Sequence, residues 1–315
     1  MNRFRILGAV LAIAALICAS GCGKQQAAGP KGAAQNPWVI GMSQCNLGEP
    51  WRVQMNADIK AAAEKHSGLN VLYKDAQNNT NTQQSQVREF TAQGVDLIIV
   101  SPKEAEPLTL PIAEAFRKGI PVIVLDRKVA GQEYTKFIGA DNVKIGREAG
   151  KYMVKLLGGK GSIVELKGLM TSTPGQDRHN GFTEGIKGSR IKIIFEADCK
   201  WLEPDARREM NSALSRFPKI DAVYAHNDPQ AHGAYMAAKQ EGKGREKTIK
   251  FIGIDALPHE GVKYVKDGVL AATFQYPTGG AEAIDSALRI LKDEDMTLGT
   301  RIFTKDNAAT GGKAL

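Results

Sequence analysis

Short apolar segments alternate with helix-like ones from residue 38 to residue 291, and this alternation constrains the fold more than any other feature of the chain. VDLIIV at 95–100 and PVIVL at 121–125 are uninterrupted apolar runs, as expected for strands that are covered on both faces. Between them, residues 105–118 have the pattern of a helix that ends at Gly119. Alternating strands and helices predict parallel sheets with right-handed crossover connections and helices on both faces.

The pattern predicts about ten strands in two runs of similar length. One large sheet is an alternative, but two sheets in two lobes fit the usual size of a domain better. The predicted strands include 39–43, 70–75, 95–100, 121–125, 162–166, 191–197, 222–225, 249–254 and 270–274. The predicted helices are 52–66, 82–93, 105–118, 144–157, 205–217, 231–240, 260–266 and 279–291, and residues 180–187 are predicted to be part of a further helix. Pro111 suggests a later start for the third helix, because proline disrupts a helix interior.

Residues 1–21 have the organisation of an export signal. Arg3 and Arg5 make its start basic, residues 6–19 are almost wholly apolar, and small residues precede Cys22. The apolar run is too short to span a bilayer, which takes roughly 20 apolar residues, so we interpret it as part of a secretory signal peptide. A cysteine at the cleavage site resembles a lipobox and predicts a lipid on Cys22; an ordinary cleaved signal is the alternative.

Residues 22–37 are rich in Gly, Ala, Gln and Pro and lack apolar periodicity, which predicts a flexible, lipidated tether. The protein would then be exported and anchored to a membrane, in the periplasm or on the outer face of the cell membrane. Only Cys45 and Cys199 belong to the expected folded part. Two free thiols are expected there, and a disulfide bond between them in an oxidising compartment is the alternative.

Charge and motif content narrow the class of protein. The formal net charge of +8 is spread along the chain without a block of five or six like charges, so no nucleic-acid site is predicted. The five histidines lack metal-binding spacing, and GxSxG, GxxxxGK[ST] and GxGxxG motifs are absent. These absences predict no catalytic site, no metal and no cofactor.

Polar side chains follow most of the predicted strands, and ligands of open parallel α/β sheets bind beyond the carboxyl ends of the strands. The residues at these ends are 43–52, Asp126 and Arg127, 171–178, Trp201, Asn227 and Asp228, Asp255, and Gln275. Carboxylates accept hydrogen bonds from hydroxyls, Arg and Asn donate to neighbouring oxygens, and an indole covers the C–H face of a sugar ring. The set predicts a sugar site. Asp228 alone is interpreted as a helix N-cap, and a surface ion pair is the alternative for Asp126 and Arg127.

Several of these segments occur together, in order, in one protein family. PVIVLDR, FIGADN, DRHNGF, VYAHND, FIGIDALP and LAATFQYP cover the chain from about residue 38 to its end. The chain resembles the periplasmic sugar-binding proteins of ABC importers, of the ribose/galactose-binding type I family. SQCNLGEPWR, DRHNGF and TKDNA are similar to the galactofuranose-binding branch. Ribose binders have two Phe after the proline of the first loop, where this chain has Trp51 and Arg52.

The resemblance implies an α/β fold of two Rossmann-like lobes with parallel sheets joined by a three-strand hinge. It implies an N-terminal lobe of 38–140 plus 276–302 and a C-terminal lobe of 141–275 plus 303–315. The three crossings between the lobes would fall near 139–141, 275–277 and 302–304.

The resemblance also implies which residues hold the ligand. Asp126 and Arg127 would bind ring hydroxyls from the N-terminal lobe, and Asp255 would accept from the C-terminal lobe. Trp201 takes roughly the place of a stacking aromatic, and Glu49 either adds a carboxylate or lines the loop. The expected ligand-binding residues are Trp51, Arg52, Asp126, Arg127, Arg178, Asn227, Asp255, Gln275 and Trp201.

The implied function is capture, in which hinge closure buries a neutral sugar (a pentose, hexose or furanose) between the lobes. The protein, expected to be a monomer, would deliver it to an ABC permease. A receptor for a sensor kinase or chemoreceptor, or a polyol or inositol ligand, is the alternative. A DNA-binding repressor with this core would have a helix-turn-helix where this chain has an export signal.

Overall fold

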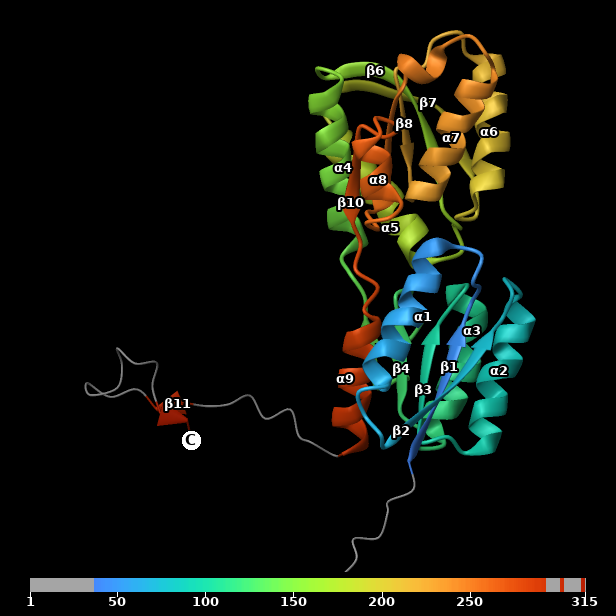
Figure 1. The fold of residues 1–315 in the computed structure, drawn as a ribbon, viewed down its shortest axis with the longest axis vertical. Helices are drawn as coiled ribbons and strands as arrows, with labels where there is room; N and C mark the ends of the chain where they lie inside the picture. The colour runs from blue at the N-terminus through green and yellow to red at the C-terminus, as the bar shows by residue number, and fades with distance from the viewer. Residues whose placement is uncertain (1–36, 293–300, 303–312, 315) are drawn as a thin grey trace, which may run out of the picture. The chain divides into compact units, whose positions relative to one another are not determined.

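The computed structural model describes residues 37–292, 301–302 and 313–314 (Figure 1). The predicted signal peptide, Cys22 and nearly all of the predicted tether lie outside these residues. The third predicted crossing beyond Ile302 and most of segment 303–315 lie outside them too. Within the described part of the chain, no helix has the length and hydropathy needed to cross a bilayer.

Two five-stranded parallel sheets form the framework, as predicted. The first has the strand order β2-β1-β3-β4-β5 and the second β10-β9-β8-β6-β7. The strands of the first are β1 (Trp38–Gln44), β2 (Leu69–Asp75), β3 (Leu97–Ser101), β4 (Val122–Leu125) and β5 (Lys136–Ile138). Those of the second are β6 (Lys160–Lys167), β7 (Arg190–Asp198), β8 (Ala222–Ala225), β9 (Lys250–Asp255) and β10 (Ala272–Gln275). A separate antiparallel pair joins β11 (Arg301–Ile302) and β12 (Lys313–Ala314).

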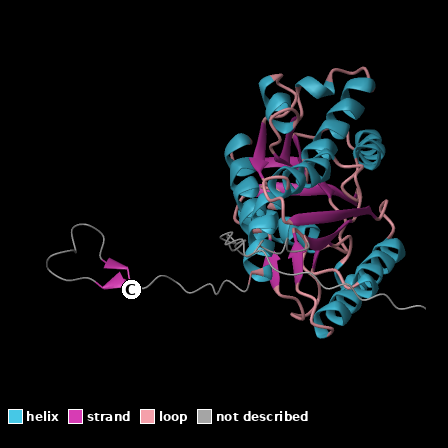
Figure 2. Cartoon of the chain, turned by 60° about the horizontal axis from the view of Figure 1, so that its bottom comes forward, coloured by secondary structure: helices cyan, strands magenta, loops and turns pink. Residues whose placement is uncertain are grey.

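Helices cover both faces of the sheets (Figure 2). They are α1 (Pro50–Ala63), α2 (Thr80–Gln93), α3 (Ala105–Arg117), α4 (Asn142–Leu156), α5 (Thr173–Ile186), α6 (Glu203–Arg216), α7 (Asp228–Gln240), α8 (Gly261–Lys266) and α9 (Gly280–Leu291), with a 3₁₀ turn at Arg245–Lys247. We call β1–β5 with α1–α3 and α9 the first lobe, because α9 packs beside α1 (Figure 1). We call β6–β10 with α4–α8 the second lobe. The exact residue boundaries of the lobes stay a prediction.

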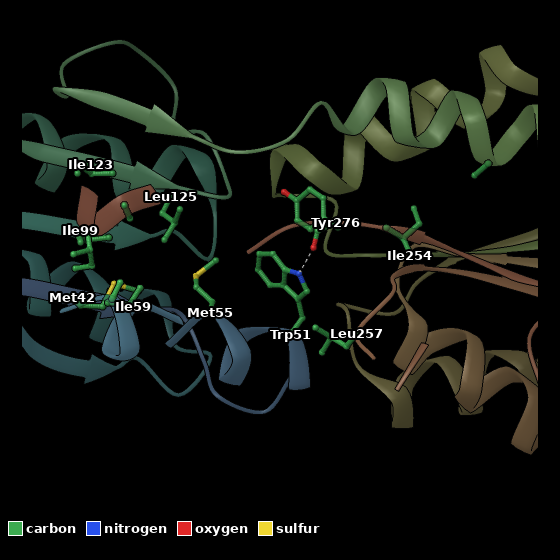
Figure 3. Packing of buried hydrophobic residues seen from close by; sticks show 14 of the residues in the cluster. Met42, Trp51, Met55, Ile59, Ile99, Ile123, Leu125, Ile254, Leu257 and Tyr276 are labelled. Atoms are coloured by element: carbon green, nitrogen blue, oxygen red, sulfur yellow. Dashed lines mark hydrogen bonds between the residues drawn. The ribbon is translucent and has the colours of Figure 1, made fainter. Parts of the chain in front are cut away.

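Two segments cross between the lobes where the sequence predicts them. Residues 139–141 lead from β5 to α4, and residues 276–279 lead from β10 to α9. One apolar cluster continues past the second crossing, through Trp51, Leu257 and Tyr276 (Figure 3). The crossing is therefore packed against side chains of both lobes.

Pro111 lies inside α3, so the predicted later start of this helix is wrong. A proline has no N–H to donate to the carbonyl four residues before it, which here is that of Pro107. Gln84 Nε2 in α2 donates to the Pro107 oxygen at 2.7 Å instead. The neighbouring helix thus satisfies the carbonyl that Pro111 leaves without its usual partner.

Arg178 lies in α5, the helix of which the sequence predicted residues 180–187 as a part. α5 starts at Thr173, with a proline in its first turn. It packs closely on α4 through glycines: a Cβ on Gly181 would lie 2.1 Å from the Val143 carbonyl oxygen, and one on Gly146 would lie 2.4 Å from that of Arg178. Because glycine lacks a Cβ, the two backbones approach one another, and this contact fixes the position of Arg178.

Candidate functional site

A cavity lies where the two lobes meet, and its lining residues come from both. Its volume is about 270 Å³, counting space open to solvent. The lining residues are Glu49, Trp51, Arg52, Asp126, Arg127, Pro174, Arg178, Trp201, Asn227, Asp255 and Tyr276. Eight of the nine residues predicted from the sequence are among them, and Gln275 is not.

On the first-lobe side, two arginines hold one aspartate. Arg52 Nη2 donates to Asp126 Oδ2 at 2.8 Å, and Arg127 Nε lies 3.6 Å from the same oxygen. Burial alone would raise the pKa of the Asp126 carboxyl, but the two guanidinium groups and a hydrogen bond from Tyr276 hold it below its usual value. Asp126 is therefore ionised and fixed in place. Because it is only 4% exposed, Asp126 and Arg127 do not form a surface ion pair, which was the alternative for these two residues.

On the second-lobe side, the pairing is looser. Arg178 Nε donates to Asn142 Oδ1 at 2.9 Å, and its Nη1 donates to the His226 carbonyl. The Asp255 carboxylate has Arg178 Nη1 at 3.9 Å as its nearest cationic partner in the described chain. Burial raises the pKa of Asp255 well above its usual value, and Arg178 offsets this only in part. Asp255 thus remains available to an additional hydrogen-bond partner.

Tyr276, at the second crossing, connects the two sides. Its hydroxyl donates to Asp126 Oδ1 at 2.6 Å and accepts from Asn142 Nδ2 at 3.3 Å. Its ring lies 4.5 Å from the Arg178 guanidinium and stacks on Trp51 with the centroids 5.0 Å apart. Trp51 Nε1 donates to the Tyr276 carbonyl, shown as a dashed line in Figure 3. One side chain therefore contacts charged groups of both lobes.

Trp201 closes the cavity on the other side. The guanidinium carbons of Arg127 and Arg178 lie 5.4 and 5.2 Å from its ring centroid, so cations from both lobes face the indole. Trp201 is 5% exposed and has φ 72°. Asp126 (φ 72°) and Asp255 (φ 127°) also have backbone conformations that non-glycine residues rarely adopt. Strained backbone of this kind clusters at functional sites.

Three buried donors in the cavity have no hydrogen-bond partner within the described chain: Arg52 Nε, Arg127 Nε and Trp201 Nε1. Leaving a buried polar group unsatisfied costs about 1–3 kcal/mol. The residues that carry these donors line the same cavity as Asp255, whose carboxyl has no close cationic partner among the described residues. The cavity is therefore suited to a ligand with several oxygens that both accept and donate hydrogen bonds, and hydroxyl groups have this property.

Two predicted roles need correction, those of Asp228 and Gln275. The N-cap of α7 is Asn227, whose Oδ1 accepts from Gln230 N, and not Asp228. Asp228 is buried and accepts from Ala256 N and Thr273 Oγ1 instead. Gln275 is exposed and does not line the cavity. The next residue, Tyr276, lines it instead. Asn227 still lines the cavity, although its Nδ2 already donates to the Trp201 carbonyl.

The remaining polar candidates have structural partners. Glu49 lines the cavity and accepts from Asn46. His179 and His226 both hydrogen-bond Glu165 at 3.0 Å; burial opposes ionisation of Glu165, but the two histidines lower its pKa to about 2. Glu165, His179 and Glu196 have ligand atoms within 4.8 Å of one another, as a metal site would. The histidine–glutamate hydrogen bonds account for this grouping without an ion.

The two cysteines of the folded part are buried and free. Burial raises the pKa of Cys45, which lies near the cavity, and raises that of Cys199 to about 12. Both thiols are therefore protonated at neutral pH, and the alternative of a disulfide bond between them does not hold in this structure.

Residues 40–295 match the sequence profile of the periplasmic binding protein domain. The chain is 29% identical to the ribose import binding protein of Escherichia coli K12 over 81% of this chain and 86% of that one. It is 33% identical to the galactofuranose-binding protein of the same organism, over 82% and 84%. Among solved structures, the fructose-binding periplasmic domain of a hybrid two-component system has 45% identity and a TM-score of 0.79, over 87% and 92%. A galactofuranose-binding protein has 31% identity and a TM-score of 0.77, over 87% and 97%. Together with the two parallel sheets and the cavity between them, these matches establish that the chain belongs to the sugar-binding periplasmic binding proteins.

Proposed function

We propose that this protein is an extracytoplasmic solute-binding lipoprotein, which captures a neutral sugar between its lobes and delivers it to an ABC permease. The observation that carries the proposal is a set of buried donors without a hydrogen bond in the described part of the chain. Both lobes contribute these donors to the cavity that Asp255 also lines. Relatives that bind ribose and galactofuranose support the ligand class. A pentose, a hexose or a furanose satisfies this set.

The charges of the cavity favour a neutral ligand. Arg52 and Arg127 are paired with Asp126, and Arg178 faces Asp255. An anionic ligand would meet the Asp126 carboxylate, whereas a hydroxyl accepts from a guanidinium, donates to a carboxylate and pairs with Asp255 in either protonation state. The balance of charge thus argues against phosphorylated and carboxylated sugars.

The proposed mechanism is capture by closure. A sugar held by one lobe recruits the donors and acceptors of the other, so its additional contacts favour the closed arrangement. Tyr276 and Trp51 lie at the crossing and contact both lobes. Their contacts would therefore change when the lobes close. The mechanism includes no chemical step, and the members of the family named above are binding proteins, so we propose no enzymatic activity.

A lipid on Cys22 would hold the protein, as a monomer, at the membrane where its partner lies and raise its effective concentration there. One acyl chain binds a membrane reversibly, whereas several chains hold it stably. The alternative function is a receptor for a membrane sensor. The 45% identity to a sugar-binding domain of a hybrid two-component system favours this alternative. Both functions use the same cavity.

A thermal-shift screen of neutral sugars and polyols tests the proposal, because a ligand that binds only the folded state raises its melting temperature. We expect a shift of several degrees with at least one neutral sugar. A protein that is folded but shifted by no sugar or polyol would contradict the proposed function. Turnover of a bound sugar would contradict the absence of catalysis.

A further inference from the structure

We propose that a groove beside the cavity is a second subsite, which accepts a second hydroxylated ring linked to the sugar in the cavity. This inference rests on the proposed function and extends its ligands to disaccharides. Glu49 and Trp201 line both the cavity and the groove, so a ligand can continue from one into the other. The groove encloses about 1090 Å³, counting space open to solvent.

Both lobes contribute to the groove. The first lobe contributes Gly48 and Glu49, which lie between β1 and α1, and Pro50, the first residue of α1. Most of the other lining residues come from α6 and its neighbours in the second lobe. Apolar surfaces on the two sides are provided by Pro50, Trp201 and Pro204. Such surfaces pack against the C–H faces of a sugar ring, as the indole does in the cavity.

Glu260 supplies a polar group that has no partner in the described chain. It is 7% exposed, it lines the groove, and its Oε2 is buried without a hydrogen bond. Burial, with the charge of Glu203, raises its pKa to about 7. A hydroxyl can donate to a carboxylate and can accept from a protonated carboxyl, so a sugar hydroxyl satisfies Glu260 in either state.

The other charged groups in the groove already have partners. Glu203 hydrogen-bonds His232 at 2.9 Å, Arg207 donates to Gln240, and Arg208 donates to Asp205. Arg207 is paired with a neutral amide, but three glutamates line the same groove and disfavour an acidic substituent, and the two arginines disfavour a cationic one. These glutamates are Glu49, Glu203 and Glu260. A neutral, hydroxylated ring fits this distribution of charge.

Isothermal titration calorimetry tests the inference. D-Fructose, D-galactose and D-ribose identify the monosaccharide that binds. A disaccharide that contains this monosaccharide is then titrated: sucrose for fructose, lactose and melibiose for galactose, and a ribosyl-ribose disaccharide for ribose. The variants are Glu260→Leu, Glu260→Gln and Asn211→Trp, which fills the groove from an exposed position of α6. Asp267→Asn, an exposed carboxylate that ends α8, is the matched control.

We expect such a disaccharide to bind the wild type within about tenfold of its monosaccharide. Glu260→Leu should weaken that compound about tenfold, the effect of roughly 1.4 kcal/mol, and Asn211→Trp should weaken it as well. Monosaccharide affinity should stay within twofold, and Glu260→Gln should retain binding of both. If the monosaccharide binds and no such disaccharide does, or if the groove variants weaken both ligands equally, the second subsite is refuted. If no sugar binds the wild type, the proposed function itself fails.

Discussion

The Tyr276 hydroxyl donates a 2.6 Å hydrogen bond to Asp126 Oδ1, although the two residues are 150 positions apart in the chain. Asp126 also accepts from Arg52, so a carboxylate of the first lobe is held partly by the segment that leads to the second. Through Asn142, the same hydroxyl is linked to Arg178. The geometry of the cavity thus depends on a contact at the crossing between the lobes.

Tyr276→Phe removes two hydrogen bonds and keeps the ring contacts with Trp51 and Arg178. Since a hydrogen bond contributes about 1 kcal/mol, we expect sugar affinity to fall roughly fivefold to thirtyfold by calorimetry. Tyr152→Phe is the control, because its hydroxyl donates only to the Ala271 carbonyl, away from the cavity. Equal affinities in the two variants would mean that the Tyr276 hydroxyl does not shape the site.

Gly181→Ala should destabilise the second lobe. The added Cβ would lie 2.1 Å from the Val143 oxygen, so α4 and α5 must separate and move Arg178. We expect a loss of about 1–3 kcal/mol, as for other overpacked sites, and weaker sugar binding. Gly68→Ala is the control, because nothing lies within 4 Å of its added Cβ. Melting curves of both variants check the prediction, and a Gly181→Ala protein as stable as Gly68→Ala would contradict it.

Stability should fall as the pH rises from about 4 to about 7. Burial raises the pKa of Asp228 and Glu260 to about 7 in the folded protein, above their unfolded values, so the folded state binds more protons. This contribution is fully present below the unfolded pKa and is lost as the pH passes the folded one. Glu260→Gln should therefore lose less in melting temperature over this range, by a few degrees, since 1 kcal/mol corresponds to roughly 2–4 °C. If the melting temperature of wild type and variant falls by the same amount over this pH range, Glu260 does not make this contribution to stability.

Cys22→Ser tests the proposed anchor. The wild type should fractionate with membranes and carry a lipid on Cys22 by mass spectrometry of the mature protein. The variant should be released into the soluble fraction and still bind sugar, because the cavity lies in residues 49–276. Cys45→Ser is the control, since Cys45 is buried in the folded part. If the wild-type protein is found in the soluble fraction and its Cys22 carries no lipid, the lipid anchor is contradicted and an ordinary cleaved signal is supported.

Local patterns predicted the sheets well, because the strands are buried on both faces and appear as apolar runs. All five residues of β3 are buried, for example. Residues at the strand ends were predicted to meet because parallel strands end at one edge of a sheet. β5 is short and partly buried and has no such run, so its sequence did not predict a strand.

The errors at the site come from one-residue offsets and from long-range contacts. Gln275, the last residue of β10, is exposed, whereas Tyr276, directly after the strand, is buried and lines the cavity. An aromatic directly after the strand was the available signal for Tyr276. Asn227 and Asp228 were likewise exchanged as the helix cap. The contact of Gln84 with the Pro107 carbonyl, which permits Pro111 inside α3, joins two helices and has no local signal.

The most direct test of the account is a calorimetric titration with the neutral sugar that gives the largest thermal shift. Wild type should bind one sugar per chain, whereas Asp126→Ala and Asp255→Ala should bind at least a hundredfold more weakly and remain folded by circular dichroism. Asp267→Asn, outside the cavity, should bind as the wild type does. Wild-type affinity in both the Asp126 and the Asp255 variants would contradict the account, because the sugar would then bind somewhere other than the cavity between the lobes.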